Sequence, residues 1–128
     1  MVRYLLDTNI VIAHFAEEPE VDARLVPGAD IYISSIVLGE LYYGAEKSGL
    51  GRANRDRIEK FAANNTVVVC DAETGRRYGL VRNRLRLKGR PIPENDMWIA
   101  ASALQHALVL VTRDAHFRDV EYLKLERW

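Results

Sequence analysis

Three aspartates stand where acidic side chains could do chemistry, because each comes at or near the end of a short apolar run. These residues are Asp7, Asp71 and Asp114. In an open parallel sheet, ligands bind in the crevice beyond the carboxyl ends of the strands. An aspartate between a strand and a helix is also a favoured helix N-cap. Position alone therefore leaves a functional and a capping interpretation open for each residue.

Glu40 adds information because it is the one charged residue in the stretch 36–45. At helical spacing, Ile36 and Gly44 lie on the same face as its side chain. A carboxylate in such apolar surroundings costs several kcal/mol unless it is paired or binds a metal ion. A helix that starts directly after Ser34 places Glu40 about one and a half turns above the edge of the sheet.

Asp96 opens an alanine-rich helical pattern. Either Asn95 or Asp96 could cap that helix, so a purely structural role is open here too. The same helix leads directly into the strand that ends beside Asp114. This arrangement favours a convergence of the acids at one edge of the sheet.

The acids must be positioned by short apolar runs, rich in β-branched residues, that alternate with longer helical patterns. The predicted strands are 4–6, 31–33, 67–70 and 108–112, with a possible fifth edge strand at 122–125, and the predicted helices are 9–16, 20–26, 35–47, 51–64, 72–88 and 95–107. Continuous apolar runs are typical of strands that are covered on both faces. Alternation of strands and helices implies right-handed crossovers and a parallel sheet. The predicted fold is therefore α/β, with three layers and a central, mostly parallel sheet of four to five strands flanked by helices.

Capping residues support two of these helices. Ser34 and Ser35 offer an N-cap to helix 35–47, and Asp71 offers one to helix 72–88. Gly89 suits the end of the latter helix.

Length and composition predict one globular domain over residues 1–128, with 48% hydrophobic and 28% charged residues. No apolar run is long enough to span a bilayer, and Asp7 comes too early for the N-terminus to be a signal peptide. The single cysteine, Cys70, has no internal disulfide partner and is expected to be buried. A reducing cytoplasm is the expected location.

Charge is balanced overall but uneven along the chain, with 18 basic and 18 acidic residues. The stretch 74–93 contains seven basic residues and no acid, namely Arg76, Arg77, Arg82, Arg84, Arg86, Lys88 and Arg90. Such a block is more often a solvated helix face than a binding site. It is nevertheless a candidate surface for a phosphate backbone.

Four sequence motifs resemble those of the PIN domain, and the likeness is greatest to the VapC-type toxins of bacterial and archaeal type II toxin–antitoxin pairs. The motifs are Leu6-Asp7-Thr8-Asn9, Ser34-Ser35 followed by Gly39-Glu40-Leu41, Asn95-Asp96 followed by Ile99-Ala100-Ala101, and Thr112-Arg113-Asp114 before Phe117. They cover nearly the whole chain in the usual order and spacing. The acidic positions of the family are filled by Asp7, Glu40, Asp96 and Asp114. Asp71 falls outside this pattern and is interpreted as a helix cap.

The resemblance implies a metal-dependent endoribonuclease that leaves a 5′-phosphate and a 3′-hydroxyl. Carboxylates without cysteine or clustered histidine select a hard cation, Mg²⁺ or Mn²⁺. Asp7 and Asp96 are expected as direct ligands, with Glu40 and Asp114 bound through water or holding a second ion. Four residues are expected to orient the carboxylates or the attacking water, namely Thr8, Asn9, Ser35 and Thr112.

The remaining polar residues receive weaker assignments. His14, His106 and His116 are scattered in the sequence, so each is expected to be a packing or surface residue rather than a catalytic base. RNA contacts are expected, if anywhere in the basic stretch, from Arg76, Arg77, Arg82, Arg84, Arg86 and Lys88.

Partners follow from the same resemblance: an RNA substrate, and an antitoxin whose tail crosses the active-site groove and places a basic side chain among the acids. A homodimer is also typical of the family. Leu80 and Leu87 lie on a different helix face from Val81 and Leu85, so they could meet either a second subunit or the core.

Two other functions remain open. A phosphotransfer or phosphatase-like domain also gathers aspartates and Mg²⁺ at strand ends, but the motif at Asp7 lacks a second aspartate and Thr112-Arg113 offers no lysine. A non-catalytic RNA-binding PIN relative would be indicated by the loss of an acid, and all four acids are present.

Overall fold

The computed structural model describes all residues, 1–128, and contains five strands that alternate with helices. The strands are β1 (Arg3–Leu6), β2 (Asp30–Ser34), β3 (Thr66–Val68), β4 (Val109–Val111) and β5 (Leu125–Glu126). The helices are α1 (Thr8–Phe15), α2 (Pro19–Asp22), α3 (Ser35–Lys47), α4 (Gly51–Ala63), α5 (Ala72–Lys88) and α6 (Glu94–Gln105), with a 3₁₀ turn, η1, at Ala115–Asp119. The predicted α/β class is confirmed.

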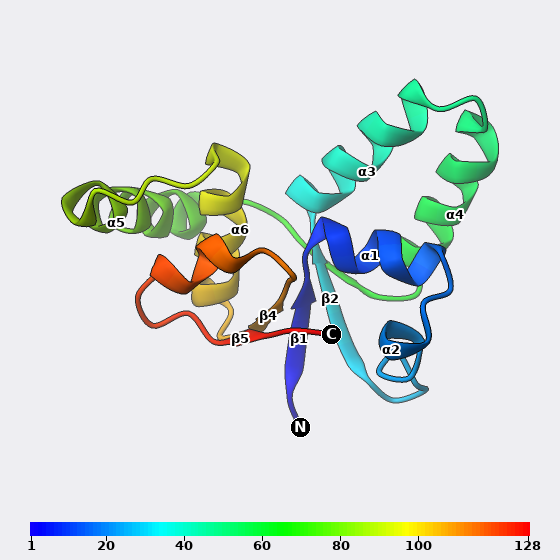
Figure 1. Ribbon diagram of the computed structural model, residues 1–128, viewed down its shortest axis with the longest axis horizontal. Coiled ribbons are helices and arrows are strands. Elements are labelled where there is room, and N and C mark those ends of the chain that lie inside the picture. The colour runs from blue at the N-terminus through cyan, green and yellow to red at the C-terminus, as the bar shows by residue number, and fades with distance from the viewer.

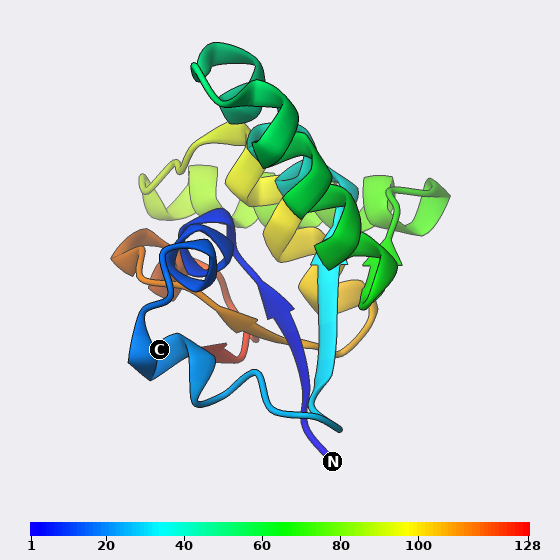
Figure 2. The same ribbon diagram turned by 90° about the vertical axis from the view of Figure 1, so that its right-hand side faces the viewer.

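All five strands run parallel in the order β3-β2-β1-β4-β5. The chain builds the sheet outward from β1 to β3, and then crosses back through α5 and α6 to add β4 on the other side of β1. Figure 1 shows α1–α4 on one side of β1, and α5, α6 and the orange η1 on the other. In Figure 2, α3, α4 and α6 lie toward the end to which the arrowheads of β1 and β2 point. The strand order therefore reverses between β1 and β4, which is the place where an open α/β sheet forms a binding crevice.

The best-predicted helices have strong end signals. Ser34 accepts a hydrogen bond from the amide of Val37 at 3.1 Å and caps α3. Asp71 and Thr74 form a reciprocal capping box at the start of α5. Gly89 ends α5 with a φ of 67°, a left-handed conformation that glycine adopts without strain. Both predicted ranges, 35–47 and 72–88, are confirmed.

Two boundary predictions are wrong by several residues. Helix α2 ends at Asp22 rather than at residue 26, because the amides of Arg24 and Leu25 bond to the carbonyls three residues back, as in a tighter turn. The fifth strand is Leu125–Glu126 rather than 122–125, because Tyr122 adopts a left-handed conformation with a φ of 67° that interrupts an extended segment.

The expected burial of the 67–70 run is also wrong. Its strand, β3, lies at the edge of the sheet and ends at Val68. Val69 is 61% exposed, and Cys70 is exposed as well. The apolar run therefore resembles that of a central strand but belongs to an edge strand.

The hydrophobic core lies between the sheet and the helices on both sides. Leu5, Leu6, Ile33, Leu110 and Val111 are buried on the central strands. Helix α5 contributes only one face to the core, with Val81 and Leu85 buried and Leu80 and Leu87 exposed. The two exposed leucines are therefore not used for core packing. No helix of the structure is long and apolar enough to cross a membrane.

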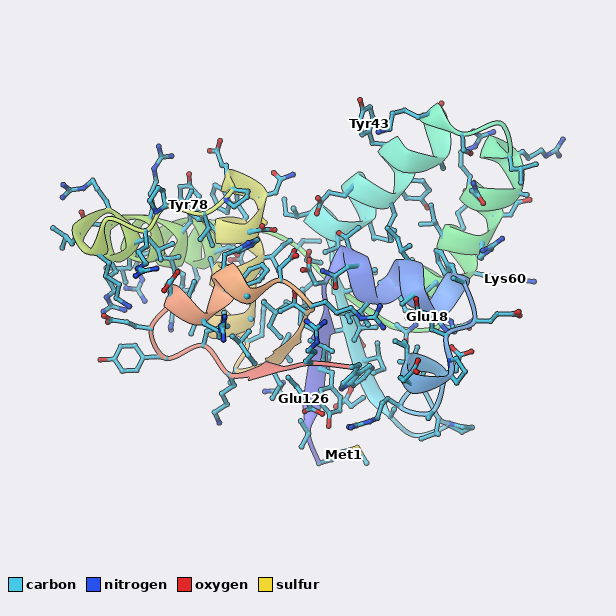
Figure 3. The ribbon with its side chains drawn as sticks, in the orientation of Figure 1. Met1, Glu18, Tyr43, Lys60, Tyr78 and Glu126 are labelled. Atoms are coloured by element: carbon cyan, nitrogen blue, oxygen red, sulfur yellow. The ribbon has the colours of Figure 1, made fainter.

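The C-terminal segment is tied to the start of the chain. Arg113 Nη2 donates to Glu18 at 2.6 Å, and its Nε donates to the carbonyl of Trp128 at 3.0 Å. Glu18 lies at the connection between α1 and α2 (Figure 3). The Trp128 ring is buried against Tyr4, with ring centroids 5.1 Å apart. These contacts fix the loop after β4, which contains Asp114.

Phe117 anchors η1, and we predict that the Phe117→Ala variant loses about 3–5 kcal/mol of unfolding free energy. Its ring is fully buried, so truncation leaves a cavity below the turn that presents Asp114 and His116. Urea unfolding followed by circular dichroism measures the loss. Leu50→Ala is the matched control, because its side chain is 70% exposed and the change should stay within about 0.5 kcal/mol. Equal effects of the two variants would contradict the anchoring role.

Candidate active site

Asp7 occupies the reversal point of the sheet. The register pairs Leu6 with Val111, so Asp7 and Thr112 follow on adjacent strands. The Asp7 amide donates to the carbonyl of Val111 at 2.9 Å, and Thr112 Oγ1 donates to Asp7 Oδ2 at 2.7 Å. Asp7 Oδ1 also accepts from the amide of Thr8 at 2.8 Å. The side chain is almost completely buried and has one fixed orientation.

Glu40 reaches the same place from α3. Thr8 Oγ1 donates to Glu40 Oε1 at 2.9 Å. Because Thr8 also donates its amide to Asp7, this single residue connects the two carboxylates. The half-buried position of Glu40 agrees with the burial expected from its uncharged surroundings.

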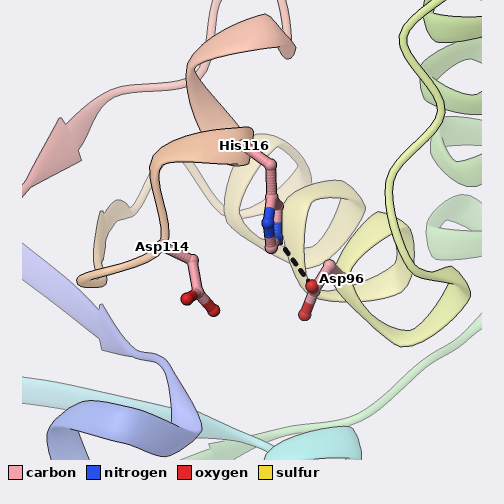
Figure 4. Close-up of side chains that lie close together, drawn as sticks. All are labelled: Asp96, Asp114 and His116. Carbon is pink, nitrogen blue, oxygen red and sulfur yellow. Dashed lines mark hydrogen bonds and ion pairs between the residues drawn. The ribbon is translucent and has the colours of Figure 1, made fainter.

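Asp96 and Asp114 complete the group from α6 and from the turn before η1. One ligand atom from each of Asp96, Asp114 and His116 lies within 4.8 Å of the others. His116 Nε2 lies 2.7 Å from Asp96 Oδ2, as Figure 4 shows. His116 therefore lies beside the acids, which its interpretation as a packing or surface residue did not predict. Its closeness to Asp96 depends on η1 folding toward α6, a contact that the histidine's sequence position does not reveal.

The four carboxylates line one open pocket of about 590 Å³. We call Asp7, Glu40, Asp96 and Asp114 the acid cluster, and the space that they line the acidic pocket. Its remaining walls are Thr8, Asn9, Ile12, Pro93, Glu94 and Asn95. The structure thus brings together all four acids singled out in the sequence.

Helix capping accounts for these acids only in part. Asp7 does cap α1 through the Thr8 amide. Helix α6 instead begins after Pro93 with no side-chain cap, so neither Asn95 nor Asp96 serves that purpose. Asp114 precedes η1 but makes no capping hydrogen bond. Asp71 caps α5 as predicted and does not line the acidic pocket.

Three of the four expected orienting residues contact the acid cluster or its supports. Besides Thr8 and Thr112, Asn9 lies with Nδ2 3.4 Å from Asp7 Oδ2 and accepts from the amide of Arg113 at 3.3 Å. Thr112 Oγ1 also accepts from the amide of Asp114 at 3.0 Å. Ser35 is different, because it starts α3 and does not line the acidic pocket. The adjacent Ser34 supplies the helix cap instead.

Burial and mutual repulsion disfavour the charged forms of Asp7, Glu40 and Asp96. Burial raises the pKa of Asp7, and the Thr112 hydrogen bond opposes this rise. Burial also raises the pKa of Glu40, with the Thr8 hydrogen bond opposing it. Burial, followed by the charge of Asp7, raises the pKa of Asp96 to about 6. A bound cation would remove the repulsion, and four carboxylates without a thiolate form an oxygen donor set that suits Mg²⁺.

Most basic side chains of α5 already contact other side chains of the protein. Arg76 and Arg77 both pair with Glu73, at 2.7 and 2.9 Å. Lys88 lies 3.5 Å from Glu121, and Arg86 donates to Asn83 at 2.8 Å. The Arg84 guanidinium lies 5.5 Å from the ring centroid of Tyr122. None of these side chains lines the acidic pocket.

Arg82 contacts Glu94, a residue that lines the acidic pocket. Its Nη1 donates to the hydroxyl of Tyr78 at 2.7 Å and lies 3.9 Å from Glu94. Arg82 and Arg86 line a hollow that shares Glu94 with the acidic pocket. Figure 3 shows Tyr78 on α5, at the far side of the molecule from α4.

A second basic hollow, of about 400 Å³, adjoins the acidic pocket at Asp114. Three arginines line it, namely Arg113, Arg118 and Arg127. Arg113 is held by Glu18, but Arg118 and Arg127 bond only to backbone carbonyls and are exposed. Sequence reasoning missed this surface, because its arginines are separated in the sequence and meet only when β5 pairs with β4.

The raised pKa of Asp96 predicts a pH dependence of stability in metal-free protein. The folded state holds a proton up to about pH 6, whereas the unfolded carboxyl loses it near 3.8. Lowering the pH from 7 to 5 should therefore raise the unfolding free energy of the wild-type protein by about 1 kcal/mol more than that of Asp96→Asn. Urea unfolding of both proteins in chelator at the two pH values measures the difference. If the unfolding free energies of the two proteins change equally with pH, the surroundings of Asp96 do not disfavour its charged form.

The PIN-domain family profile matches residues 4–122. Ribonuclease VapC2 of Haemophilus influenzae is 37% identical, with 100% of this chain and 99% of the relative covered. The tRNA(fMet)-specific endonuclease VapC of Shigella flexneri is 36% identical over the same shares.

Solved structures agree with this assignment over the full length. VapBC2 from Rickettsia felis, bound to a DNA fragment from its promoter, superposes with a TM-score of 0.90 at 33% identity, covering 100% of this chain and 99% of that chain. DNA-bound VapBC from Salmonella typhimurium gives a TM-score of 0.91 at 32% identity, with the same coverage. The parallel five-stranded sheet, the family profile and the full-length relatives lead to one conclusion: the chain belongs to the PIN-domain family, in its VapC group.

Proposed function

We propose that this protein is a Mg²⁺-dependent endoribonuclease and the toxin of a type II toxin–antitoxin pair. The observation that carries the proposal is the convergence of four carboxylates in one pocket, with the pKa of three of them raised. The names of the relatives, ribonuclease VapC2 and tRNA(fMet)-specific endonuclease VapC, support the reaction class. The expected products carry a 5′-phosphate and a 3′-hydroxyl.

The acid cluster is proposed to hold the metal. Asp7 and Asp96 are the direct ligands, because both are largely buried and held by neighbours. Glu40 and Asp114 bind through water or hold a second ion. When bound, Mg²⁺ supplies an activated water and stabilises the charge that develops on the phosphate. Mn²⁺ also binds carboxylate oxygens and is expected to substitute.

The surrounding residues fix the carboxylates for this task. The Thr112 hydroxyl donates to the Asp7 carboxylate and accepts a hydrogen bond from the backbone amide of Asp114, so one hydroxyl links Asp7 to the residue that carries the Asp114 carboxylate. Thr8 contacts two acids through different groups, because its amide donates to Asp7 and its hydroxyl donates to Glu40. Asn9 links Asp7 to the loop after β4. Such supports keep ligand positions within the narrow tolerance that Mg²⁺ geometry demands.

RNA is proposed to cross the acid cluster between two basic surfaces. The exposed Arg118 and Arg127 lie on the Asp114 side. Arg82 and Arg86 lie on the Glu94 side. The other basic residues of α5, which are Arg76, Arg77, Arg84 and Lys88, are proposed to add weaker, outer contacts, because three of them are already paired with carboxylates.

An antitoxin is proposed to occupy the apolar groove of about 370 Å³ between α1, α3 and α4. Its walls include Ile12, Phe15, Leu41 and Ile58, and it meets the acidic pocket at Ile12 and Glu40. An amphipathic antitoxin helix in this groove would place a following basic side chain among the acids. The VapBC complexes of the relatives support such a partner. Leu80 and Leu87 of α5 remain the proposed contacts of a homodimer.

We predict that Asp7→Asn and Asp96→Asn each reduce cleavage of total RNA at least 100-fold, because each removes one carboxylate from the metal site. Chelation should stop the wild-type reaction, and Mg²⁺ or Mn²⁺ should restore it. Cleavage is followed on denaturing gels with purified protein. The control is Asp56→Asn, an exposed aspartate of α4, which should cleave at the wild-type rate.

Other results would select other functions. Wild-type protein that binds RNA with Mg²⁺ but leaves it intact would indicate a non-catalytic RNA-binding relative. Hydrolysis of a phosphomonoester with intact RNA would indicate a phosphatase-like domain. Full RNA cleavage in excess chelator would overturn the metal mechanism.

Salt dependence tests the two basic surfaces. Each lost phosphate contact should flatten the slope of log affinity against log salt by about 0.7 for single-stranded RNA. We therefore expect Arg118→Gln with Arg127→Gln to flatten it by about 1.4. Neutralising Arg82, Arg84 and Arg86 together should flatten it by a smaller amount per residue. Binding titrations in chelator keep the RNA intact.

The control for both variants is Arg52→Gln, an exposed arginine of α4 that lies outside both surfaces. Its slope should equal that of the wild type. If the slope of an arginine variant equals that of the wild type, the surface that it alters does not contact the RNA.

A further inference from the structure

His116 is the one nitrogen donor beside the acid cluster, and neither the family motifs nor the relatives' names assign it a role. Its ring comes from η1, while Asp96 comes from α6 and Asp114 from the loop between β4 and η1 (Figure 4). Phe117, which is fully buried, fixes the backbone next to it. The ring is thus presented by an anchored turn rather than by a free surface loop.

The three donor atoms lie close enough to share one cation. Ligands at about 2.1 Å from an ion are about 3.0 Å apart at neighbouring octahedral positions and about 4.2 Å apart at opposite ones. Nε2 of His116 and Oδ2 of Asp96 are 2.7 Å apart, and all three ligand atoms lie within 4.8 Å. Asp114 is exposed, so a side-chain rotation can close the remaining difference.

The chemistry of the donors favours a particular class of ion. Neutral imidazole with its proton on Nδ1 leaves the Nε2 lone pair free for a cation. Transition-metal ions accept such a nitrogen readily, whereas Mg²⁺ prefers oxygen ligands throughout. A set of two carboxylates and one imidazole therefore favours Mn²⁺ over Mg²⁺.

We propose that Asp96, Asp114 and His116 form a cation site in which His116 Nε2 is a direct ligand, so that the site selects a transition-metal ion such as Mn²⁺ over Mg²⁺. This inference deepens the proposed function, because it rests on the acid cluster being a metal site. In this role His116 binds the ion directly, rather than only holding Asp96 by a hydrogen bond.

Electron spin echo spectroscopy of the Mn²⁺-loaded protein tests the proposal directly, since it detects ¹⁴N bound to the ion without any need for RNA cleavage. The wild type should show a nitrogen coupling that disappears in His116→Gln. The control is His14→Gln, because His14 pairs with Asp22 and does not line the acidic pocket. That variant should keep the coupling.

Calorimetric titration with Mn²⁺ and Mg²⁺ gives a second measurement. His116→Gln should lower the ratio of Mn²⁺ affinity to Mg²⁺ affinity about tenfold, while Mg²⁺ binding changes little. Thermal unfolding checks that the variant is folded.

Each outcome separates the inference from the proposed function. Nitrogen coupling in a protein that does not cleave RNA would support the His116 site and reject the nuclease assignment. RNA cleavage with Mg²⁺ but no nitrogen coupling, or no Mn²⁺ binding at all, would overturn the His116 site and leave the nuclease intact.

Discussion

Repulsion among carboxylates that share one pocket is the constraint on which the rest of this structure depends. Four acids from four different segments meet where the strand order reverses, and burial makes the charged forms of Asp7, Glu40 and Asp96 still less favourable. A protein gains no stability from such an arrangement, since like charges in a low-dielectric site oppose each other. The pocket therefore has the properties of a functional site, in which local cost is offset by packing elsewhere.

The fold offsets that cost by making each acid part of its framework. Asp7 is fixed by the β1–β4 register and by Thr112, and Glu40 is fixed by Thr8. The loop that carries Asp114 is held by Arg113 through Glu18 and the Trp128 carbonyl. Because Thr8 and Thr112 each contact two of these acidic residues, the site is held in place before any ion binds. This preorganisation is what a cation with strict coordination geometry requires.

The sequence predicts much of this architecture because its strongest signals are local. The boundaries of α3 and α5 follow from Ser34, Asp71 and Gly89, whose side chains or backbone freedom act within one helical turn. The four acids are recognisable because each borders or interrupts an apolar segment. Asp7 and Asp114 come after apolar strands, Glu40 interrupts an apolar helix, and Asp96 comes just before one. The exposed Cys70 is not predictable in this way, since an apolar edge strand and an apolar central strand have the same local pattern.

Long-range features are likewise beyond the local signals. His116 reaches Asp96 across 20 positions, and Arg118 and Arg127 share a hollow only because β5 adds to the sheet in parallel. The basic block on α5 is conspicuous in the sequence, yet Glu73 and Glu121 pair with several of its charges.

Anomalous diffraction from crystals grown with Mn²⁺ tests the central claim most directly. The account predicts a manganese peak in the acidic pocket, about 2 Å from carboxylate oxygens of Asp7 and Asp96. A well-ordered pocket without a peak, or a peak only at other carboxylates, would contradict it.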